Sequence, residues 1–275
     1  MSADVLLRLD GISIRLPDPH EPALVDGVTL DVARGECLGL VGESGSGKSL
    51  LLRSIIGLVP PPLSAAGEVL WSDVPGAPLL AMDRRAARGR DVSMIFQEPM
   101  RSLNPSKRVS WTLAEPLRMR RGLHGVALRE RIISLLEDVG IDDPHRIARS
   151  YPHELSGGLQ QRVMIAAALS TDPDLLLCDE PTTALDVTTQ ARIIDLLKEL
   201  QRSRGLSLVF VSHDLAVISE IADRVAVLNG GTLLEVGTAR EVILDPRHSY
   251  TRMLVSSIPE QLSAGTTTDP TEAHP

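Results

Sequence analysis

The sequence has no hydrophobic run long enough to cross a lipid bilayer. A membrane-spanning helix needs about 20 apolar residues, whereas the longest unbroken apolar tract, Val163 to Leu169, has seven. Near the N-terminus, Asp4, Arg8 and Asp10 interrupt the apolar stretch that a secretory signal would require. We therefore expect a chain that does not itself cross a membrane and that stays in the cytosol.

Cysteine and aromatic residues are also scarce. The two cysteines, Cys37 and Cys178, have no CxxC spacing and no histidine nearby, so neither a disulfide framework nor a zinc site is predicted. The aromatic residues all lie at or after Trp71. The N-terminal part of the chain therefore has no aromatic ring to offer a ligand.

The charge balance is acidic. Lys and Arg number 28 against 36 Asp and Glu, which gives a formal net charge of −8 at pH 7. An acidic field repels phosphate backbones and disfavours a general nucleic-acid-binding surface. Two arginine-rich segments, 84–90 and 118–121, are interpreted as solvated helix faces. With 275 residues, 43% hydrophobic and 23% charged, the chain is expected to be a soluble globular protein of one large or two small domains.

Hydrophobic periodicity predicts alternating strands and helices. Apolar runs predict strands at 5–16, 28–32, 37–41, 69–71, 92–96, 175–178, 206–211, 225–228 and 232–236. Helical spacing predicts helices at 48–58, 82–89, 113–119, 128–139, 163–169, 188–200 and 215–221. We expect the first two strands to form an antiparallel edge and the last two to form a hairpin about Asn229 and Gly230.

The same pattern divides the chain into four segments. Residues 1–98 are predicted to form the first part of an α/β core, 99–162 a helical insertion, and 163–258 the rest of the core. Residues 259–275 have too little apolar surface to fold alone and are expected to be a flexible tail.

One segment has the spacing G-x-x-x-x-G-K-S and lies between a predicted strand and a predicted helix, the context that a phosphate-binding loop requires. Glycines let backbone N–H groups turn toward phosphate oxygens, and the helix N-terminus adds partial positive charge. Lys48 would reach the β and γ phosphates, and Ser49 would ligate Mg²⁺. The predicted nucleotide-binding residues here are Gly42, Glu43, Ser44, Gly45, Ser46, Gly47, Lys48, Ser49 and Leu50.

Two acids follow the apolar run Leu175 to Cys178. In parallel α/β sheets ligands gather at the carboxyl ends of strands, so Asp179 can meet the glycine-rich loop there and act as a metal ligand. Glu180 could accept a proton from an attacking water molecule.

Several further segments together resemble the ATP-binding cassette (ABC) ATPases. Residues 155–161 are similar to the LSGGQ signature of that family, Gln97 to its Q-loop, 184–186 to its D-loop and 211–214 to its switch histidine. These segments follow the family's order, and the resemblance covers residues 5 to 245. It implies an α/β fold of the ABC-type P-loop NTPases, with a RecA-like core sheet, an antiparallel β edge subdomain and a helical insertion.

The resemblance also implies residue roles. Two cassettes are expected to sandwich ATP head to tail, with the signature of one facing the phosphate loop of the other. Glu180, His213 and Gln97 are then the expected catalytic residues, with Gln97 also near the metal. The expected nucleotide contacts beyond the phosphate loop are Ser156, Gly157, Gly158, Gln160 and Asp186.

A narrower similarity points to importers of oligopeptides, dipeptides or nickel. It lies in residues 96–105, 151–158, 179–186 and 246–251. It implies an ATP-hydrolysing motor subunit at the cytoplasmic face of the membrane, with two transmembrane permeases, a second ABC ATPase and, indirectly, an extracytoplasmic solute-binding protein as partners. Nickel or metallophore uptake, an exporter subunit, and a soluble ABC ATPase acting on nucleic acid or ribosomes remain alternatives.

Two features depart from these relatives. The family usually stacks adenine on an aromatic ring early in the chain, where only Leu16 or His20 is available here. Many peptide-importer ATPases carry a cysteine-rich C-terminal extension for an iron–sulfur cluster, whereas no cysteine follows Cys178. We therefore expect ATP and Mg²⁺ as cofactors and no iron–sulfur cluster.

Overall fold

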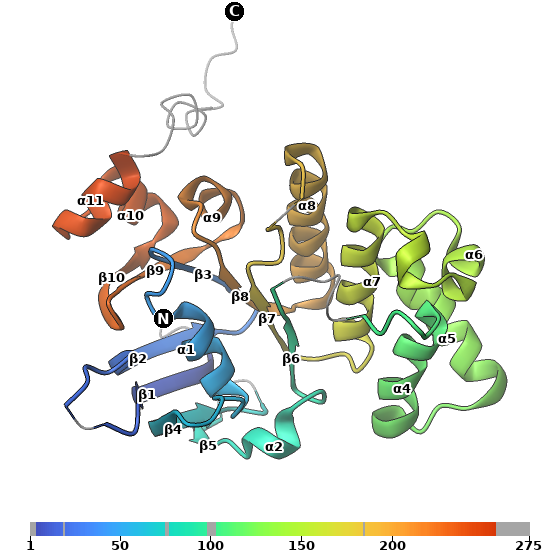
Figure 1. Cartoon of the computed structure of the whole chain (residues 1–275), viewed down its shortest axis with the longest axis horizontal. Helices are drawn as coiled ribbons and strands as arrows, with labels where there is room; N and C mark the ends of the chain where they lie inside the picture. The colour runs from blue at the N-terminus through green and yellow to red at the C-terminus, as the bar shows by residue number, and fades with distance from the viewer. Residues whose placement is uncertain (1–3, 19, 75–76, 98–102, 184, 257–275) are drawn as a thin grey trace, which may run out of the picture.

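The computed structural model describes residues 4–18, 20–74, 77–97, 103–183 and 185–256. The cartoon in Figure 1 shows a part built on two β-sheets and, beside it, a part made of helices. Within the described residues, no helix is both long and apolar enough to cross a membrane. The predicted alternation of strands and helices is confirmed.

The larger sheet carries the phosphate loop. Its strands, in spatial order, are β10 (Thr232–Thr238), β9 (Arg224–Asn229), β3 (Cys37–Val41), β8 (Ser207–Val211), β7 (Leu175–Asp179) and β6 (Val92–Ile95). All neighbours are parallel except β10 and β9, which form the predicted hairpin. Every residue of β3, β7 and β8 is buried, as expected for a parallel sheet covered on both faces.

The smaller sheet is antiparallel and confirms the predicted antiparallel subdomain. Its order is β2 (Val25–Ala33), β1 (Val5–Arg15), β4 (Ser64–Trp71) and β5 (Leu80–Ala81). Its apolar side chains share one buried cluster with helix α1 (Lys48–Ile55) and with Leu38, Leu175 and Val209 of the larger sheet. This packing fixes α1 between the two sheets.

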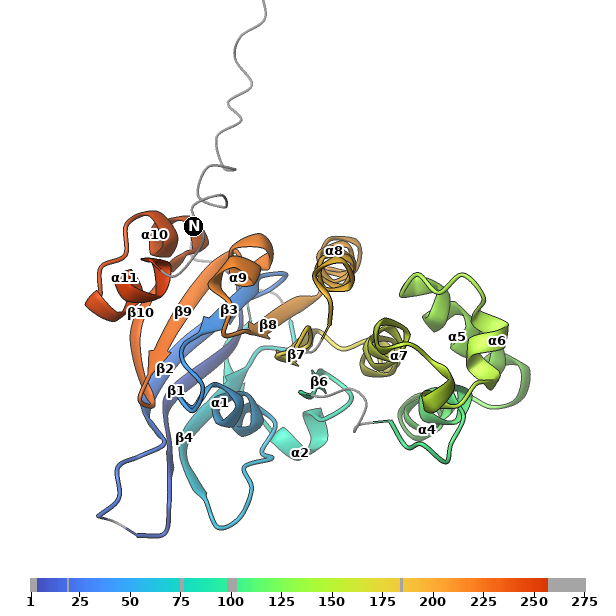
Figure 2. The ribbon, with the colours of Figure 1, turned by 45° about the horizontal axis from the view of Figure 1, so that its top comes forward.

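The remaining helices pack on the opposite face of the larger sheet or lie beside it. Figure 2 shows α1 on one side of strands β3 and β8, with α8 and α9 on the other. The side chains of β7 alternate between the two faces of the sheet. Leu175 and Leu177 pack on the α1 side, and Leu176 and Cys178 pack on the α8 side. The helices are α2 (Arg84–Ala87), α4 (Val109–Arg121), α5 (Gly125–Asp138), α6 (Pro144–Arg149), the 3₁₀ turn η1 (Pro152–Glu154), α7 (Gly157–Leu169), α8 (Val187–Arg204), α9 (Leu215–Ile221), α10 (Ala239–Leu244) and α11 (Ser249–Ser256).

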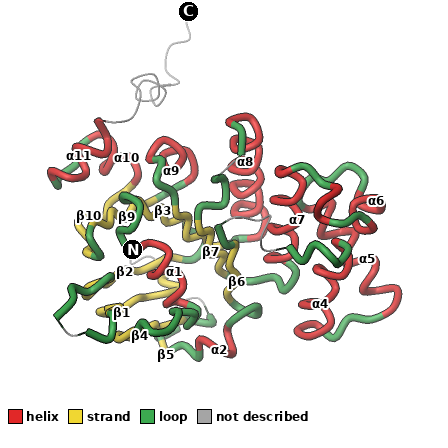
Figure 3. The backbone as a smooth tube through the Cα atoms, in the orientation of Figure 1, coloured by secondary structure: helices red, strands yellow, loops and turns green. Residues whose placement is uncertain are grey.

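Helices α4 to α7 form the helical part between β6 and β7, drawn in red in Figure 3. Three of the helices were not predicted. Pro144 opens α6, where Asp143 caps the helix by accepting a hydrogen bond from the Arg146 N–H (3.0 Å). Helices α10 and α11 bury one residue each, Val242 and Thr251, so they carry little of the apolar repeat on which the prediction rests.

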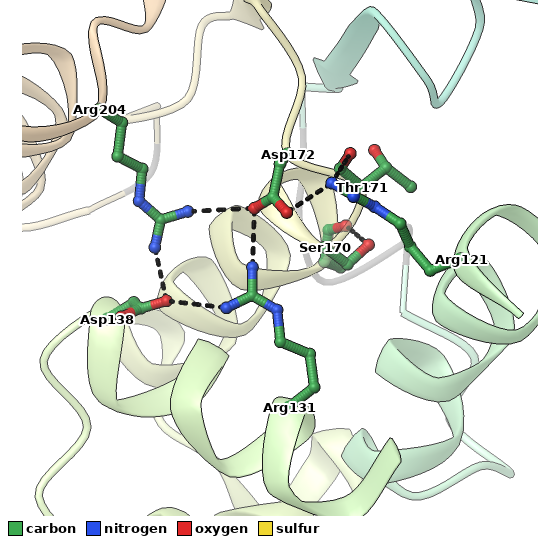
Figure 4. Close-up of polar contacts among 8 residues, drawn as sticks. Arg121, Arg131, Asp138, Ser170, Thr171, Asp172 and Arg204 are labelled. Carbon is green, nitrogen blue, oxygen red and sulfur yellow. Dashed lines mark hydrogen bonds and ion pairs between the residues drawn. The ribbon is translucent and has the colours of Figure 1, made fainter. Parts of the chain in front are cut away.

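A cluster of ion pairs joins the helical part to the core sheet's helix α8. Asp172, in the loop between α7 and β7, contacts Arg131 of α5 (2.7 Å) and Arg121 of α4 (2.5 Å). Asp138 of α5 in turn contacts Arg204 of α8 (2.5 Å). Figure 4 shows the five side chains converging from these separate elements. We call these five residues the arginine–aspartate cluster.

Candidate functional site

The phosphate loop runs from the end of β3 to the start of α1 and is tightly enclosed. Gly42, Gly45 and Gly47 all have positive φ angles, of 153°, 83° and 96°. A Cβ atom at Gly42 would lie 2.0 Å from the Leu228 carbonyl oxygen, and one at Gly47 would lie 2.7 Å from the Leu24 carbonyl oxygen. Only glycine fits these two positions, because a side chain at either would collide with a backbone carbonyl.

Lys48 is the buried cation of the loop. Its Nζ donates hydrogen bonds to the carbonyl oxygens of Gly42 and Glu43, both at 2.7 Å, and to Ser46 Oγ at 3.3 Å. Burial lowers the pKa of this ammonium, and the nearby carboxylates Glu180 and Asp179 counteract that shift. The charge is therefore held between the loop backbone and the two acids.

Asp179 reaches the loop from the carboxyl end of β7. Ser49 Oγ donates a hydrogen bond to Asp179 Oδ1 at 2.7 Å. The second carboxylate oxygen, Oδ2, is buried and has no hydrogen-bond partner among the described residues. Burial raises the pKa of this carboxyl group above its usual range, although the Ser49 hydrogen bond works in the opposite direction. A buried carboxylate with a free oxygen beside a serine hydroxyl is a donor set suited to a divalent cation.

Polar side chains from several segments converge on Glu180. Its Oε2 accepts hydrogen bonds from Gln97 Nε2 (3.0 Å) and from Thr183 Oγ1 (2.9 Å). His213 Nδ1 lies 3.5 Å from the same oxygen. Glu180 also has a positive φ of 49°, an uncommon conformation for a residue other than glycine. These contacts hold the carboxylate at one place beside the phosphate loop.

The signature residues lie at the start of α7. The Ser156 side chain caps this helix by accepting a hydrogen bond from the Leu159 N–H (3.4 Å). Gly157 and Gly158 are exposed and half-buried, respectively. A Cβ atom at Gly158 would lie 2.8 Å from Thr189 Cγ2 of α8. The lack of side chains therefore brings the signature against the first turn of α8.

Asp186 belongs with the signature residues, which form a second group apart from the residues around the phosphate loop. It caps α8 by accepting hydrogen bonds from the Thr189 N–H (2.9 Å) and the Thr189 Oγ1 hydroxyl (2.7 Å). The Thr189 hydroxyl is the main cause of a lowered pKa for this carboxyl group. Through Thr189, Asp186 and Gly158 are neighbours in one chain.

The structure separates these two groups of predicted site residues. Figures 1 and 2 both place strands β6 and β7 between α1, which follows the phosphate loop, and α7, which carries the signature. Within one chain, Ser49 at the end of the phosphate loop bonds to Asp179, and Gln97 and His213 contact the adjacent Glu180. The signature lies on the far side of strands β6 and β7 from that loop.

Three predicted nucleotide contacts have other surroundings. Gln160 is buried, and its Nε2 donates hydrogen bonds to the carbonyl oxygens of Pro152 (2.9 Å) and Leu155 (3.1 Å), so it braces the turn before the signature. Leu50 packs against the buried cluster around α1. Ser46 is buried beside Lys48, whereas Glu43, Ser44 and Gly45 are exposed.

The candidates for an adenine contact lie in the segment between β1 and β2. Leu16 directly follows β1 and is partly buried, while His20 is exposed. Ala184 and the segment after Gln97, residues 98–102, lie outside the described residues.

Sequence reasoning missed three contacts at the site. Thr183 was part of a recognised motif without a role, yet it donates a hydrogen bond to Glu180. Gly231 donates its N–H to the Ser46 carbonyl oxygen (3.2 Å), and Tyr250 accepts a hydrogen bond from the Glu43 N–H (3.0 Å). No local pattern signals contacts across about 200 residues of sequence.

The larger sheet presents a glycine-rich loop, a lysine and a buried acid at one edge. This arrangement defines a P-loop nucleotide-binding protein. The ABC transporter family model matches residues 25–183. The chain belongs to the ABC transporter family, and this membership makes it an ABC-type ATPase.

Curated relatives that are 44 to 46% identical to this chain are transport ATP-binding proteins. The dipeptide transport ATP-binding protein DppD of Haemophilus influenzae is 45% identical over 259 residues, covering 93% of this chain and 78% of that protein. The oligopeptide transport ATP-binding protein OppD of Bacillus subtilis is 44% identical, covering 89% and 69%. The peptidoglycan transport ATP-binding protein YejF of Agrobacterium fabrum is 46% identical over 86% of this chain, which spans only 44% of that relative's length.

A solved structure agrees with the fold. The ATP-binding cassette MJ0796, in a dimeric post-hydrolysis state bound to ADP and Pi, is 30% identical with a TM-score of 0.72. The match covers 86% of this chain and 99% of that cassette. The predicted fold class and ATPase activity are thereby confirmed.

Proposed function

We propose that the chain is the ATP-hydrolysing motor subunit of a membrane importer for dipeptides, oligopeptides or a related small solute. The observation that carries the proposal is the convergence of Asp179, Glu180, Gln97 and His213 beside the phosphate loop. The import of peptides rests on the names of the relatives, which are dipeptide and oligopeptide transport ATP-binding proteins.

The phosphate loop and Lys48 would hold the ATP phosphates. Lys48 is buried and already oriented by the loop carbonyls, so its charge can act on phosphate oxygens with little competition from water. Ser49 and Asp179 would hold Mg²⁺, and the unpartnered Asp179 Oδ2 fits that role. The cation would neutralise negative charge on the β and γ phosphates.

Glu180 is the base in this proposal. Its carboxylate would accept a proton from the water molecule that attacks the γ-phosphate. Gln97 and Thr183 fix Oε2 by donating hydrogen bonds, and they leave Oε1 to face the water. His213 is exposed and lies beside the same carboxylate, so it can turn to donate a hydrogen bond to the γ-phosphate.

The signature would act on the phosphate loop of a second cassette. Ser156 and the Gly157 and Gly158 amides at the start of α7 form an uncrowded group of donors. Because strands separate this group from its own phosphate loop, a partner cassette would bring it to a nucleotide. The partner is a second ABC ATPase, different or identical.

The helical part is the proposed contact to the permeases. A cavity of about 560 Å³ opens between α4 and α5, and the exposed Trp111 and half-buried Tyr151 line it. Lys107 Nζ lies 5.0 Å above the Trp111 ring. An exposed aromatic at a hollow suits a protein interface. We infer two permease subunits, an indirect link to an extracytoplasmic solute-binding protein, and a location at the cytoplasmic face of the membrane.

An affinity pull-down tests this function. Tagged chain is recovered from detergent-solubilised membranes of its own host, and its partners are identified by mass spectrometry. We expect two polytopic membrane proteins and a second cassette ATPase. A Trp111→Ala chain should recover fewer permeases while it still binds ATP. Recovery of only soluble proteins or nucleic acid with the unmodified chain would contradict the transport assignment.

A further inference from the structure

The last described helix, α11, reaches the phosphate loop. The Glu43 N–H donates a hydrogen bond to the Tyr250 hydroxyl oxygen at 3.0 Å, across 207 residues of sequence. The Tyr250 ring is half-buried and packs against the main hydrophobic cluster. The hydroxyl therefore comes from a ring that packs against the core on one side.

The start of α11 is itself held firmly. Glu235 of β10 accepts hydrogen bonds from the Arg247 N–H (2.9 Å) and the His248 N–H (3.0 Å). The Tyr250 N–H then donates to His248 Nδ1 at 3.1 Å. Since β10 pairs with β9 and β9 with β3, the helix is anchored to the sheet from which the phosphate loop emerges.

The hydroxyl and Lys48 act on one peptide group. The peptide between Gly42 and Glu43 has its N–H bonded to Tyr250 and its carbonyl bonded to Lys48 Nζ at 2.7 Å. A peptide unit is planar, so fixing the direction of its N–H also fixes the direction of its carbonyl. A tyrosine hydroxyl is neutral at physiological pH, and burial raises the pKa of Tyr250 further.

Loss of the hydroxyl would free this peptide to rotate. The loop is rich in glycine and has high conformational freedom, so ordering it on binding a nucleotide costs free energy. An outer contact that already holds the peptide in place reduces that cost. The contact also keeps the carbonyl directed at Lys48, the cation that the phosphates need.

We propose that Tyr250 is a positioning residue that sets nucleotide affinity by fixing the Gly42–Glu43 peptide, and with it Lys48. This inference rests on ATP binding at the phosphate loop, the site of the proposed function. It assigns a task in the ATP site to a segment that lies beyond the family match at residues 25–183.

The test compares Tyr250→Phe with the unmodified full chain. Phenylalanine keeps the ring packing and removes only the hydroxyl. We expect the Kd for ATP, measured by calorimetry, to rise about 3- to 10-fold, the effect of one net hydrogen bond. The KM for ATP should rise in parallel, while kcat at saturating ATP stays within about twofold, because Glu180 is untouched.

Ser256→Ala is the matched control, since it removes a hydroxyl from the same helix that, among the described residues, bonds to the Met253 carbonyl oxygen and not to the phosphate loop. Its Kd should equal that of the unmodified chain. An unchanged Kd in Tyr250→Phe, with or without a lower melting temperature, would overturn the proposal. If the unmodified chain binds no ATP, the proposed function fails instead.

Discussion

At the scale of single residues, Glu180 is the proposed base, and Gln97, Thr183 and His213 converge on it. Its Oε2 is held by Gln97 and Thr183, which fits a base of fixed position. We predict that Glu180→Gln lowers ATP turnover by about 10²–10⁴-fold, the usual contribution of a general base, and leaves ATP affinity intact. Phosphate release and calorimetry measure the two quantities. Asp195→Asn, on an exposed position of α8, is the control; near-normal turnover in Glu180→Gln would refute the role.

We expect the ionised carboxylate of Asp179 to serve metal binding but to lower the stability of the nucleotide-free fold. Burial raises its pKa, so the folded state without nucleotide disfavours the ionised carboxylate. Stability from this group is therefore present below its unfolded pKa and is lost as pH rises through the folded pKa. We predict that Asp179→Asn raises the melting temperature of the nucleotide-free chain by a few degrees at pH 7 and flattens this loss.

The same substitution should remove the metal's contribution. Mg²⁺ added with ATP should raise the melting temperature of the unmodified chain further than ATP alone, and this increment should vanish in Asp179→Asn. Thermal unfolding at several pH values, with and without Mg²⁺, measures both effects. A less stable nucleotide-free variant would contradict the reasoning.

The residues of the site differ in how far the sequence could predict them. Lys48, Ser49 and Asp179 were predictable because the motif is local and because parallel strands end at one edge of the sheet. The roles of Gln160 and Tyr250 were not, because they depend on how a side chain packs. Gln160 turns inward to two carbonyls, and Tyr250 contacts Glu43 only through the fold of the whole chain.

At the scale of elements, the arginine–aspartate cluster joins α4 and α5 to α8. Asp172 contacts three of its arginines and has a φ of 50°, a conformation that asparagine also tolerates. We predict that Asp172→Asn lowers the free energy of unfolding by about 1 kcal/mol, since the pairs are partly exposed. High salt should shrink the difference.

Urea unfolding at low and high ionic strength checks this prediction. Asp195→Asn again serves as the control, because it removes an exposed carboxylate that lies outside the cluster. An equal effect of both substitutions would show that net charge rather than the cluster is responsible.

Elements with a clear apolar pattern were predictable, and those without one were not. The strand at Cys37–Val41 was predicted with the bounds that the structure gives. The predicted helix at 82–89 is shorter, because Asp83 caps it and it ends at Ala87. Helix α6 was missed because a proline can open a helix as well as end one.

At the scale of the whole molecule, the signature lies apart from its own phosphate loop, so we expect activity to depend on assembly with a partner cassette. We predict that the isolated chain hydrolyses ATP slowly and that its turnover rises at least about tenfold when the partner cassette is added. A signature placed against the γ-phosphate contributes donors that a single chain lacks, and one such donor is worth about 10²–10³ in rate.

Steady-state phosphate release across a titration of the partner measures this effect. A Gly158→Val chain is the informative variant, because its new side chain would crowd Thr189 beside the signature, the proposed contact to the partner. Full turnover by the dilute, isolated chain would contradict the dependence on assembly.

The position of β3 also governs when the protein can first respond to its ligand during synthesis. This early strand lies between β8 and β9, which are among the last to leave the ribosome. The strand that ends in the phosphate loop therefore lacks β8 until residue 211 has been made and β9 until residue 229, and the loop lacks Tyr250 for longer. We therefore expect ATP to stabilise nascent chains only once they have reached that length.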